Sequence, residues 1–247
     1  MSRVYGKHID ISSDSIQKFF EHRAHAFNPK SPLTSVMYQD AHPEIAIERD
    51  RLEVARILPL LALNGTQTVL DVGCGIGRWA KHVHPHCSSY LGTDAAKGLI
   101  ERARQYCAAP HVSFQALSAD EIAAGVLAAH PPFNRIILSG ILIYLNDEQV
   151  ANLLRRLSTM CAPSAVVYIR EPMGCDQRLT LDGHWSSELS AEYNAIYRTE
   201  AELSGMLVDA FSASGFEVPP FEKLYGDDRL NNRSDTQQQF VLVRKSK

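Results

Sequence analysis

The most constraining feature of this sequence is the run Val69-Leu70-Asp71-Val72-Gly73-Cys74-Gly75-Ile76-Gly77-Arg78-Trp79-Ala80. An apolar segment ends in a carboxylate, three glycines follow at alternate positions, and an amphipathic stretch begins after them. This order predicts a strand, a tight turn and a helix, because glycine allows backbone conformations that other residues avoid and lets a ligand approach bare main chain. The acid precedes the glycines, and the spacing is G-x-G-x-G rather than the G-x-G-x-x-G of dinucleotide-binding turns. The turn therefore disfavours a nicotinamide-dependent oxidoreductase and suits a ligand that carries positive charge.

Short apolar segments alternate with helical patterns after this turn, which indicates parallel strands buried on both faces. The expected fold class is α/β, a doubly wound, mostly parallel, seven-stranded sheet. The last two strands are expected to pair antiparallel across a long polar connection. The predicted strands are 66–72, 89–94, 111–116, 133–140, 165–172, 215–218 and 238–244, and the predicted helices between them are 78–83, 97–108, 119–129, 147–160 and 199–214.

Two regions stand outside this alternation. Residues 1–65 show no strand pattern; a capped helix at 13–24 and a longer one from about Pro43 to Leu63 predict a helical cap or lid. Residues 174–198 are polar and aromatic and predict a second cap segment, placed beside the carboxyl ends of the strands where ligands of open α/β sheets bind. The expected organisation is thus an amino-terminal cap region, 1–65, and a core, 66–247, that contains the insertion.

Composition narrows the class of protein. A chain of 247 residues suits one α/β domain with a modest cap, and a net charge of −3 argues against a nucleic-acid or anionic-membrane partner. The chain shows neither an apolar run of about 20 residues nor a signal peptide, so a cytoplasmic protein is expected. Five cysteines without a C-x-x-C pair suit reduced thiols. The oligomeric state stays open, with a homodimer among the alternatives.

From about residue 44 to 244 the chain resembles class I S-adenosylmethionine-dependent methyltransferases. The run Asp71–Gly77 resembles the first motif of that family, in which the glycine turn packs against the methionine part of the cofactor. The resemblance implies that Asp94, at the end of the second strand, binds the ribose hydroxyls; a carboxylate can accept from two adjacent hydroxyls at once. The cofactor is therefore expected to be S-adenosylmethionine, with S-adenosylhomocysteine as the product.

The third strand departs from the family pattern. An acid is expected near Ser118-Ala119 to meet the adenine amine, and here Asp120 comes slightly later, so either its side chain or the Ala119 backbone takes that place, unless Asp120 only begins a helix. Ser139 and Gly140 resemble the segment whose backbone contacts the cofactor's amino group. The predicted cofactor-binding residues are Asp71, Gly73, Cys74, Gly75, Gly77, Asp94, Ala119, Asp120 and Ser139.

Methyl transfer is an in-line displacement at carbon, so the protein must align a nucleophile and, for a hydroxyl, remove its proton. Groups at strand ends or on the cap are placed for this. Each has a structural alternative: Tyr144 packing on the cofactor, Glu171 pairing with an arginine, Arg198 at a solvated helix entry, His25 on the surface. The predicted catalytic residues are Tyr144, Glu171 and His25, and the predicted substrate-binding residues are Arg170, Tyr193, Tyr197 and Arg198.

Histidines at 82, 84 and 86 alternate, but Pro85 interrupts a regular strand and no carboxylate lies beside them, so no metal site is predicted. The leading hypothesis for function is methylation of a small metabolite, a sugar or a natural-product intermediate, at oxygen. One alternative is methylation of an amine, including a protein or peptide amino terminus, because Gly75–Arg78 and Ile169–Met173 faintly resemble amino-terminal protein methyltransferases. A further alternative is a non-catalytic module that binds the cofactor.

Overall fold

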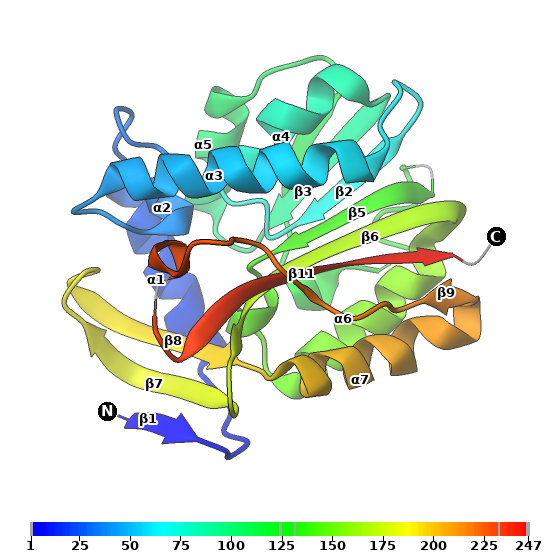
Figure 1. Cartoon of the computed structure of the whole chain (residues 1–247). Helices are drawn as coiled ribbons and strands as arrows, with labels where there is room; N and C mark the ends of the chain where they lie inside the picture. Colours follow the sequence, from blue (N-terminus) through cyan, green and yellow to red (C-terminus); the bar gives the residue numbers. More distant parts are fainter. Residues whose placement is uncertain (1, 124, 131, 232, 246–247) are drawn as a thin grey trace.

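A twisted central sheet forms the core of the chain (Figure 1). The computed structural model describes residues 2–123, 125–130, 132–231 and 233–245. Across these residues the sheet holds eight strands in the order β10-β11-β6-β5-β2-β3-β4, with β9 also paired to β11. The bounds are β2 Thr68–Val72, β3 Ser89–Asp94, β4 Val112–Ala116, β5 Phe133–Ser139, β6 Cys161–Gly174, β9 Phe216–Glu217, β10 Glu222–Lys223 and β11 Thr236–Lys245.

The five strands β4, β3, β2, β5 and β6 are parallel, and β11 runs antiparallel to β6. The prediction of a doubly wound, mostly parallel sheet is confirmed, and β9 pairs antiparallel with β11 as expected. The predicted count of seven strands is one short, because the two residues of β10 also pair with β11. Since parallel strands end at one edge, Asp71, Asp94 and Ser139 all lie at the carboxyl edge of the sheet.

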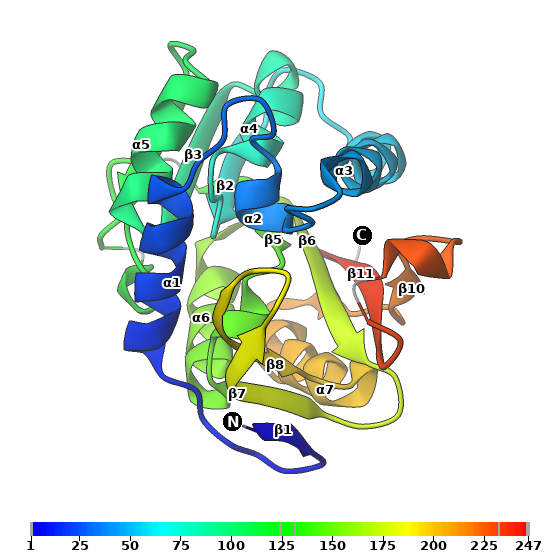
Figure 2. The ribbon, with the colours of Figure 1, turned by 90° about the vertical axis from the view of Figure 1, so that its left-hand side faces the viewer.

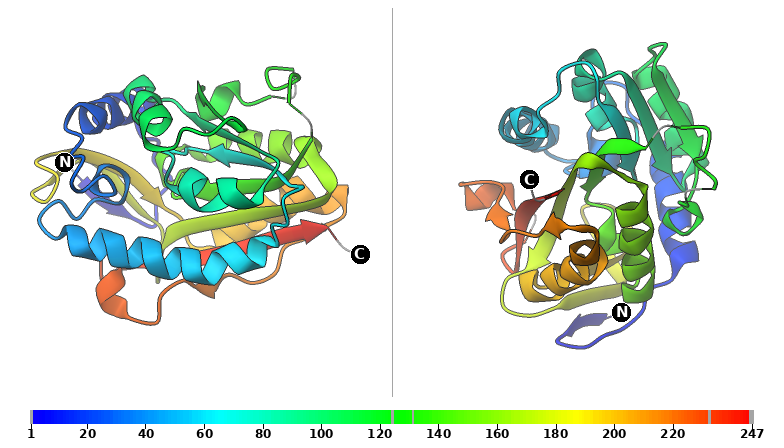
Figure 3. Two further views of the ribbon diagram at one scale, coloured as in Figure 1. Left: turned by 90° about the horizontal axis from the view of Figure 1, so that it is seen from above. Right: turned by 90° about the vertical axis from the view of Figure 1, so that its right-hand side faces the viewer.

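Helices cover both faces of the sheet (Figure 3). Side chains of a strand alternate between faces, so Leu70 of β2 packs into the cluster that holds α6 and α7, whereas Val69 packs into the opposite cluster with Trp79 and Tyr168. The helices are α3 Pro43–Ile57, α4 Arg78–Val83, α5 Lys97–Tyr106, α6 Asp147–Met160 and α7 Glu200–Phe211, and the short 3-10 turns are η1 Leu58–Leu61, η2 His84–His86, η3 Ala119–Glu121, η4 Leu142–Tyr144, η5 Ser212–Ser214 and η6 Asp228–Leu230.

A second, smaller sheet corrects the prediction for both cap regions. Strands β1 Ser2–Tyr5, β7 Leu179–Ser186 and β8 Ala191–Tyr197 form an antiparallel sheet in the order β1-β7-β8 (Figure 2). The prediction of a strand-free amino terminus was wrong, because β1 is four residues long and finds its partner more than 170 positions away. The insertion was predicted only as a polar and aromatic cap segment, and it is a β-hairpin. Its alternation is interrupted by an irregular register where Gly183 has a φ of 56°.

Two amino-terminal helices join this small sheet. They are α1 Ser13–His25 and α2 Thr34–Met37. Phe19 of α1 packs with Tyr193 of β8, their ring centroids 5.7 Å apart, and both belong to a buried cluster with Leu179 and Leu181. We call β1, α1, α2, β7 and β8 together the cap. Residues 2–37 and 179–197, separate in sequence, therefore pack into one unit beside the carboxyl edge of the sheet. The prediction that all of 1–65 forms a cap was wrong for α3, because Ile57 at its end packs on the central sheet with Trp79 and Tyr168.

The helix predicted over 119–129 is the other difference. The structure has only the 3-10 turn η3, begun by a capping box between Ser118 and Glu121, followed by turns in the described part of the segment. Gly125 lowers the helical propensity of this stretch, and residue 124 lies outside the described residues. None of the described helices has the length and apolar character required to cross a membrane.

Candidate active site

The glycine turn after β2 adopts the conformation that its sequence predicts. Gly73, Gly75 and Gly77 have φ values of 73°, 56° and 75°, a region that residues with a Cβ rarely occupy. A Cβ at Gly73 would lie 2.8 Å from Cδ1 of Ile141, and one at Gly75 would lie 2.6 Å from Cγ1 of Val36 on α2. Neither position has room for a side chain, so bare main chain faces the space beyond the strand.

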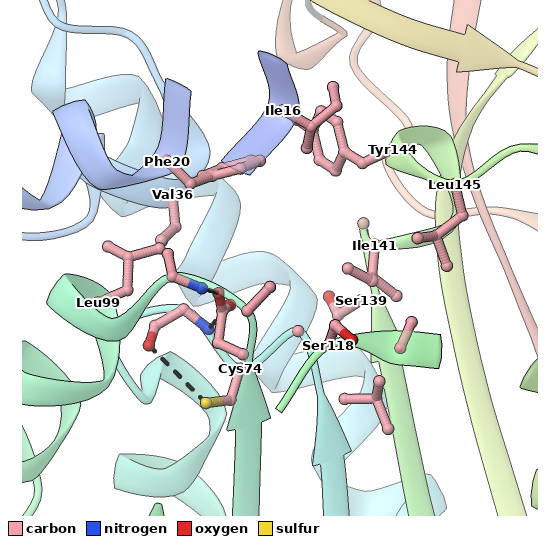
Figure 4. Close-up of a pocket in the computed structure, with 18 of the residues that line it drawn as sticks. Ile16, Phe20, Val36, Cys74, Leu99, Ser118, Ser139, Ile141, Tyr144 and Leu145 are labelled. Carbon is pink, nitrogen blue, oxygen red and sulfur yellow. Dashed lines mark hydrogen bonds between the residues drawn. The ribbon is translucent and has the colours of Figure 1, made fainter. Parts of the chain in front are cut away.

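A cavity, here called the first cavity, lies between this turn, the ends of β3 and β5, and helices α1 and α2 (Figure 4). Phe20 of α1 and Val36 of α2 close it from the cap side, and Ile141 and Tyr144 close it from the segment after β5. Of the predicted cofactor-binding residues, those that line the first cavity are Asp71, Gly73, Cys74, Gly75, Asp94, Ala119, Asp120 and Ser139.

Gly77 does not line the first cavity. It is the N-cap of α4, and a Cβ there would lie 3.0 Å from Cζ of Phe114. The structure therefore places this glycine in helix packing rather than beside a ligand. Cys74 lines the cavity with its thiol directed to the carbonyl oxygen of Gly75, 3.8 Å away (Figure 4). Burial raises the pKa of this thiol, so it is protonated and unreactive as a nucleophile at neutral pH.

The two acids at the strand ends are buried and hydrogen-bonded. The hydroxyl of Tyr90 donates to Oδ2 of Asp71, and Asp94 accepts from the backbone N–H groups of Gly75, at 3.0 Å, and Ala96, at 2.9 Å. Burial raises the pKa of Asp71 to about 7 and the pKa of Asp94 to about 6, in spite of these bonds. A cationic ligand in the first cavity would stabilise the ionised form of both carboxylates.

Asp120 lies on η3 at the rim of the first cavity. Its Oδ2 accepts from Nε2 of Gln149 at 2.7 Å, and Gln149 also lines the cavity. Ala119, the preceding residue, contributes to the same wall. Both alternatives for the adenine contact, the Asp120 side chain and the Ala119 backbone, are thus at the cavity and stay predictions.

A buried ion network connects α3 to the glycine turn and to β6. Glu53 on α3 is fully buried and lies 3.1 Å from Nη2 of Arg78 and 3.4 Å from Nη2 of Arg170. It also accepts from Oγ of Ser139 at 2.9 Å and from the hydroxyl of Tyr168 at 2.8 Å. Burial opposes its ionisation, but Arg170 and Arg78 outweigh burial and lower the pKa of Glu53 to about 2. The network is a fixed, charged wall behind Ser139.

Glu53 was not predicted from the sequence, although the pattern of residues in α3 indicates that it is buried. The buried residues of α3 are Ala46, Arg49, Glu53 and Ile57, which follow one another at the three- and four-residue spacing of one helix face. A charged pair on an otherwise apolar stripe indicates buried polar groups with partners elsewhere in the fold. The prediction used the apolar residues of this helix and did not consider what the charged ones face.

A second cavity, of about 60 Å³, adjoins the first on the cap side. Both cavities share Val36, Met37, Ser139, Gly140, Tyr144 and Arg170 in their linings, so the walls of one continue into the other. The remaining lining of the second cavity is Tyr38, Arg49, Ile143, Pro172, Tyr193, Tyr197, Tyr225 and Gln238. The predicted substrate residues Arg170, Tyr193 and Tyr197 and the predicted catalytic residue Tyr144 thus come together there.

Buried phenols dominate this second cavity. The hydroxyl of Tyr144 hydrogen-bonds with that of Tyr38 and, at 2.9 Å, with that of Tyr193. Burial raises the pKa of each of these tyrosines, and of Tyr197, above the ordinary value. At neutral pH the phenols are un-ionised and act as hydrogen-bond donors and acceptors rather than as bases.

Glu171 and Arg198 lie outside the linings of both cavities. Glu171 accepts from the backbone N–H groups of Leu142, at 2.9 Å, and Ile143, at 3.3 Å. Arg198 donates to the carbonyl oxygens of Leu142 and Leu145, each at 2.7 Å. Both side chains are occupied in holding η4, the turn that carries Tyr144, so the geometry gives them a positioning role and not the direct one that the sequence suggested.

The histidines singled out in the sequence are also placed away from the cavities. His25 ends α1, is exposed, and bonds through Nδ1 to the carbonyl oxygen of Glu21 at 3.0 Å. His82 lies 3.2 Å from Oδ2 of Asp50, and the carbonyl oxygen of His84 bonds to His111. Within the described chain, no group of three or more His, Cys, Asp or Glu side chains is arranged to hold a metal ion.

Residues 69–164 match the model of a family described as a methyltransferase domain. This match begins at β2 and includes the glycine turn, both acids and the segment after β5. Residues 69–164 thus belong to a methyltransferase domain, and the chain shares its fold with solved S-adenosylmethionine-dependent methyltransferases.

Known proteins with this domain include several that are similar to the chain. It is 26% identical over 222 residues to an O-methyltransferase of Pyrenophora dematioidea, a match that covers 87% of the chain and 74% of that protein. It is 24% identical over 132 residues to 23S rRNA (uracil(1939)-C(5))-methyltransferase RlmD of Legionella pneumophila, covering 51% of the chain but only 30% of that relative. An S-adenosylmethionine-dependent methyltransferase of Leishmania major shares the fold, with a TM-score of 0.62 and 18% identity over 98% of the chain and 97% of its own.

Proposed function

We propose that the chain binds S-adenosylmethionine in the first cavity and transfers its methyl group to an oxygen atom of a small molecule held in the second cavity. The residues present suit this cofactor. The turn at Gly73 and Gly75 has no space for a Cβ and would receive the methionine part, and the ionised forms of Asp71 and Asp94 would be stabilised by its positive charges and hydroxyls. When bound, the cofactor supplies a methyl carbon on a sulfonium that is already activated for displacement.

The observation that carries the proposal is the continuity of the two cavities at Ser139, Gly140 and Tyr144. A molecule in the second cavity would meet the first cavity beside η4, which Glu171 and Arg198 hold in place. Alignment at short distance is the main requirement of methyl transfer, so a rigid η4 matters more than an additional catalytic group.

The small-molecule acceptor follows from how the second cavity is enclosed. Its volume is about 60 Å³, and Tyr38, Tyr193 and Tyr197 of the cap region wall it in with their side chains buried. A cavity of this volume suits a small group better than an extended RNA or protein surface. The similarity to the O-methyltransferase of Pyrenophora dematioidea extends over 87% of the chain and so reaches beyond the methyltransferase domain into part of the cap, which supports oxygen as the acceptor atom.

Methylation of an amine is the second candidate. The chain is 25% identical over 135 residues to phosphoethanolamine N-methyltransferase 1 of Triticum aestivum, but that match covers 55% of the chain and 26% of the relative. The lining of the second cavity includes Arg49 and Arg170 and, among the residues described, neither Asp nor Glu. A protonated amine has no counter-charge in that lining, which favours the oxygen acceptor.

The proposal is tested by incubating the protein with S-adenosylmethionine labelled in the methyl group and a small-molecule extract of the cells in which the chain is expressed. We expect a labelled product of low mass, whose fragmentation by mass spectrometry places the label on oxygen. Label on nitrogen would support the second candidate. Label in a protein band or in RNA would contradict the small-molecule assignment.

A matched pair of variants shows whether this label depends on the site. Asp94→Asn keeps the shape of the side chain and removes the charge that Gly75 and Ala96 contact. Asp14→Asn removes an exposed acid in the first turn of α1. We expect the first variant to lose label and the second to behave as the wild type. Equal labelling by the wild type and both variants would contradict the assignment of the first cavity as the cofactor site.

A further inference from the structure

Arg49 stands out among the buried arginines of the chain. It lies on α3 with 4% of its surface exposed, and it lines the second cavity. Its Nε donates to the carbonyl oxygen of Leu230 at 2.7 Å. Within the described residues, its two terminal nitrogens have no hydrogen-bond partner and no carboxylate oxygen within 4.0 Å. The guanidinium therefore presents unused donors to the cavity.

The terminal nitrogens of the other buried arginines have carboxylate or carbonyl oxygens as partners. Arg78 pairs with Asp50 at 2.8 Å, and Arg198 pairs with Asp147 at 2.7 Å. Arg135, which also lacks a carboxylate among the described residues, donates instead to four backbone carbonyl oxygens. A buried charge that is neither paired nor fully hydrogen-bonded is unfavourable, and such groups are common where a ligand completes the site.

The charges around Arg49 do not compensate it. Arg170 lines the same cavity and disfavours the charged form of Arg49, because both carry positive charge. The carboxylate that pairs with Arg170 is Glu53, which also pairs with Arg78. Glu188 favours the charged form of Arg49, but this carboxylate is exposed, lies beyond ion-pairing distance and accepts from the backbone of Gln39. The hydroxyl of Tyr225 donates to the carbonyl oxygen of Arg49, not to its side chain. The wall of the second cavity is thus positive.

We infer that Arg49, with Arg170 behind it, forms an anion-binding subsite of the second cavity, and that the methyl acceptor carries a negatively charged oxygen acid, a carboxylate or a phosphoryl group. This inference rests on the proposed function and specifies its substrate class. A guanidinium with two free terminal nitrogens matches the two oxygens of such an acid. Neutral phenols and the amide of Gln238 supply the remaining polar contacts without adding negative charge.

The lining of the second cavity also bears on how the acceptor oxygen becomes a nucleophile. Its described residues include neither Asp, Glu nor His, and its tyrosines are un-ionised because burial raises each pKa. An alcohol would need a base to remove its proton. The oxygen of an acid is ionised at neutral pH: it forms the bond to the methyl carbon as the carbon–sulfur bond breaks, and no proton has to move. An acid acceptor therefore needs no base in the second cavity.

The test separates the acceptors by charge before the reaction. A small-molecule extract is divided by ion exchange into anionic, neutral and cationic fractions, and each is incubated with the wild-type protein and methyl-labelled S-adenosylmethionine. We expect at least ten times more label in products from the anionic fraction than from the other two. Label mainly from the neutral or cationic fraction would overturn the inference and leave the proposed function standing. Failure of the wild type to bind the cofactor would instead remove the proposed function.

Variants then assign the effect to Arg49. In Arg49→Gln we expect the half-saturating amount of the anionic fraction to rise at least 30-fold, with unchanged affinity for S-adenosylmethionine. Arg49→Lys, which keeps the charge, should recover part of this loss. Arg51→Gln is the matched control, because Arg51 lies on the same helix, is exposed and pairs with Glu48. If Arg49→Gln binds the cofactor and saturates with the anionic fraction as the wild type does, the subsite is wrong.

Treatment of the anionic fraction with a phosphatase distinguishes the two sources of the negative charge. Loss of acceptor activity would identify a phosphate monoester, and retention would identify a carboxylate or another phosphatase-resistant acid; both results support an anionic acceptor. If Arg49→Gln does not fold, the comparison of the anionic, neutral and cationic fractions with the wild-type protein still decides the inference.

Discussion

The two cavities are built from different kinds of sequence. The first cavity takes its polar lining from short segments at the ends of consecutive strands, such as the turn after β2 and Asp94 at the end of β3. The second cavity shares η4 and the end of β5 with the first, and takes the rest of its lining from α2, α3, β6, β8, β11 and the segment before η6, which are distant in the chain. Both lie at one edge of the same sheet. A cofactor site can therefore be encoded in a local motif, whereas the acceptor site that we propose depends on tertiary packing.

Glu53 connects the two cavities, because it binds Arg78 on one side and Arg170 on the other. We expect Glu53→Gln to lower the free energy of unfolding by about 3 kcal/mol or more, since it leaves two buried arginines without their shared acid. Chemical denaturation measures the change. Glu48→Gln on the same helix, where the carboxylate is exposed, should unfold as the wild type does. An equally small change for both variants would show that the two halves of the site are not coupled through this acid.

The next largest expected effect is that of a substitution in the glycine turn, which should change cofactor binding in the first cavity only. We expect Gly73→Ala to weaken binding of S-adenosylmethionine by roughly 30-fold, about 2 kcal/mol, because the φ of 73° is strained for alanine and its Cβ would lie 2.8 Å from Ile141. Gly65→Ala is the matched control: its φ is 91° and a Cβ there meets nothing within 4 Å. Titration calorimetry should show normal affinity for the control. Equal losses in both variants would mean that backbone strain alone, not contact at the cavity, governs binding.

The pH dependence of cofactor binding also belongs to the first cavity. Burial raises the pKa of Asp71 from 3.8 to about 7, so this acid favours folding at low pH and progressively opposes it as the pH rises to about 7. A cationic ligand prefers the ionised form. We expect affinity for S-adenosylmethionine to rise by up to about tenfold between pH 6 and pH 8 and then level off. Asp71→Asn should reduce this rise to about twofold, which is the part that Asp94 contributes as it ionises above its pKa of about 6. An affinity that falls with rising pH would contradict the assignment.

A single phenol tests the second cavity alone. We expect Tyr38→Phe to lower kcat/KM for the acceptor about fivefold, roughly 1 kcal/mol for one lost hydrogen bond, with no change in cofactor affinity. Tyr5→Phe removes an exposed hydroxyl from β1 of the cap and should leave both quantities unchanged. Steady-state kinetics with the anionic fraction measures the first effect. A change in cofactor affinity in Tyr38→Phe would show that the cap phenols serve both cavities.

The contrast between the cavities also explains what sequence reasoning could reach. The apolar strands, the glycine conformations and the convergence of Asp71 with Asp94 follow from local pattern and from the rule that parallel strands end at one edge, and the structure agrees. The bounds of α6, Asp147–Met160, agree with the prediction to the residue, and the structure shows a capping box between Asn146 and Gln149 at its start.

The second cavity could not be read in the same way. The pairing of β1 with β7 joins residues such as Val4 and Thr180. A strand of four residues is too short for its hydrophobic pattern to predict a partner so far away in the sequence. The sequence predicts Glu171 at a strand end, where an active acid would be expected, but β6 continues to Gly174 and the oxygens of Glu171 accept from the backbone of Leu142 and Ile143. Arg49 could not be distinguished from the other arginines in the sequence, because only the structure shows that its terminal nitrogens lack a partner in the described part of the chain.

We propose that cofactor and acceptor occupy separate, adjoining cavities, the first organised by the acids at the strand ends and the second by Arg49. Titration calorimetry of S-adenosylmethionine into the wild type, Asp94→Asn and Arg49→Gln tests it most directly. We expect one binding site in the wild type, at least tenfold weaker binding in Asp94→Asn, and unchanged binding in Arg49→Gln. No binding to the wild type, or equal losses in the two variants, would contradict it.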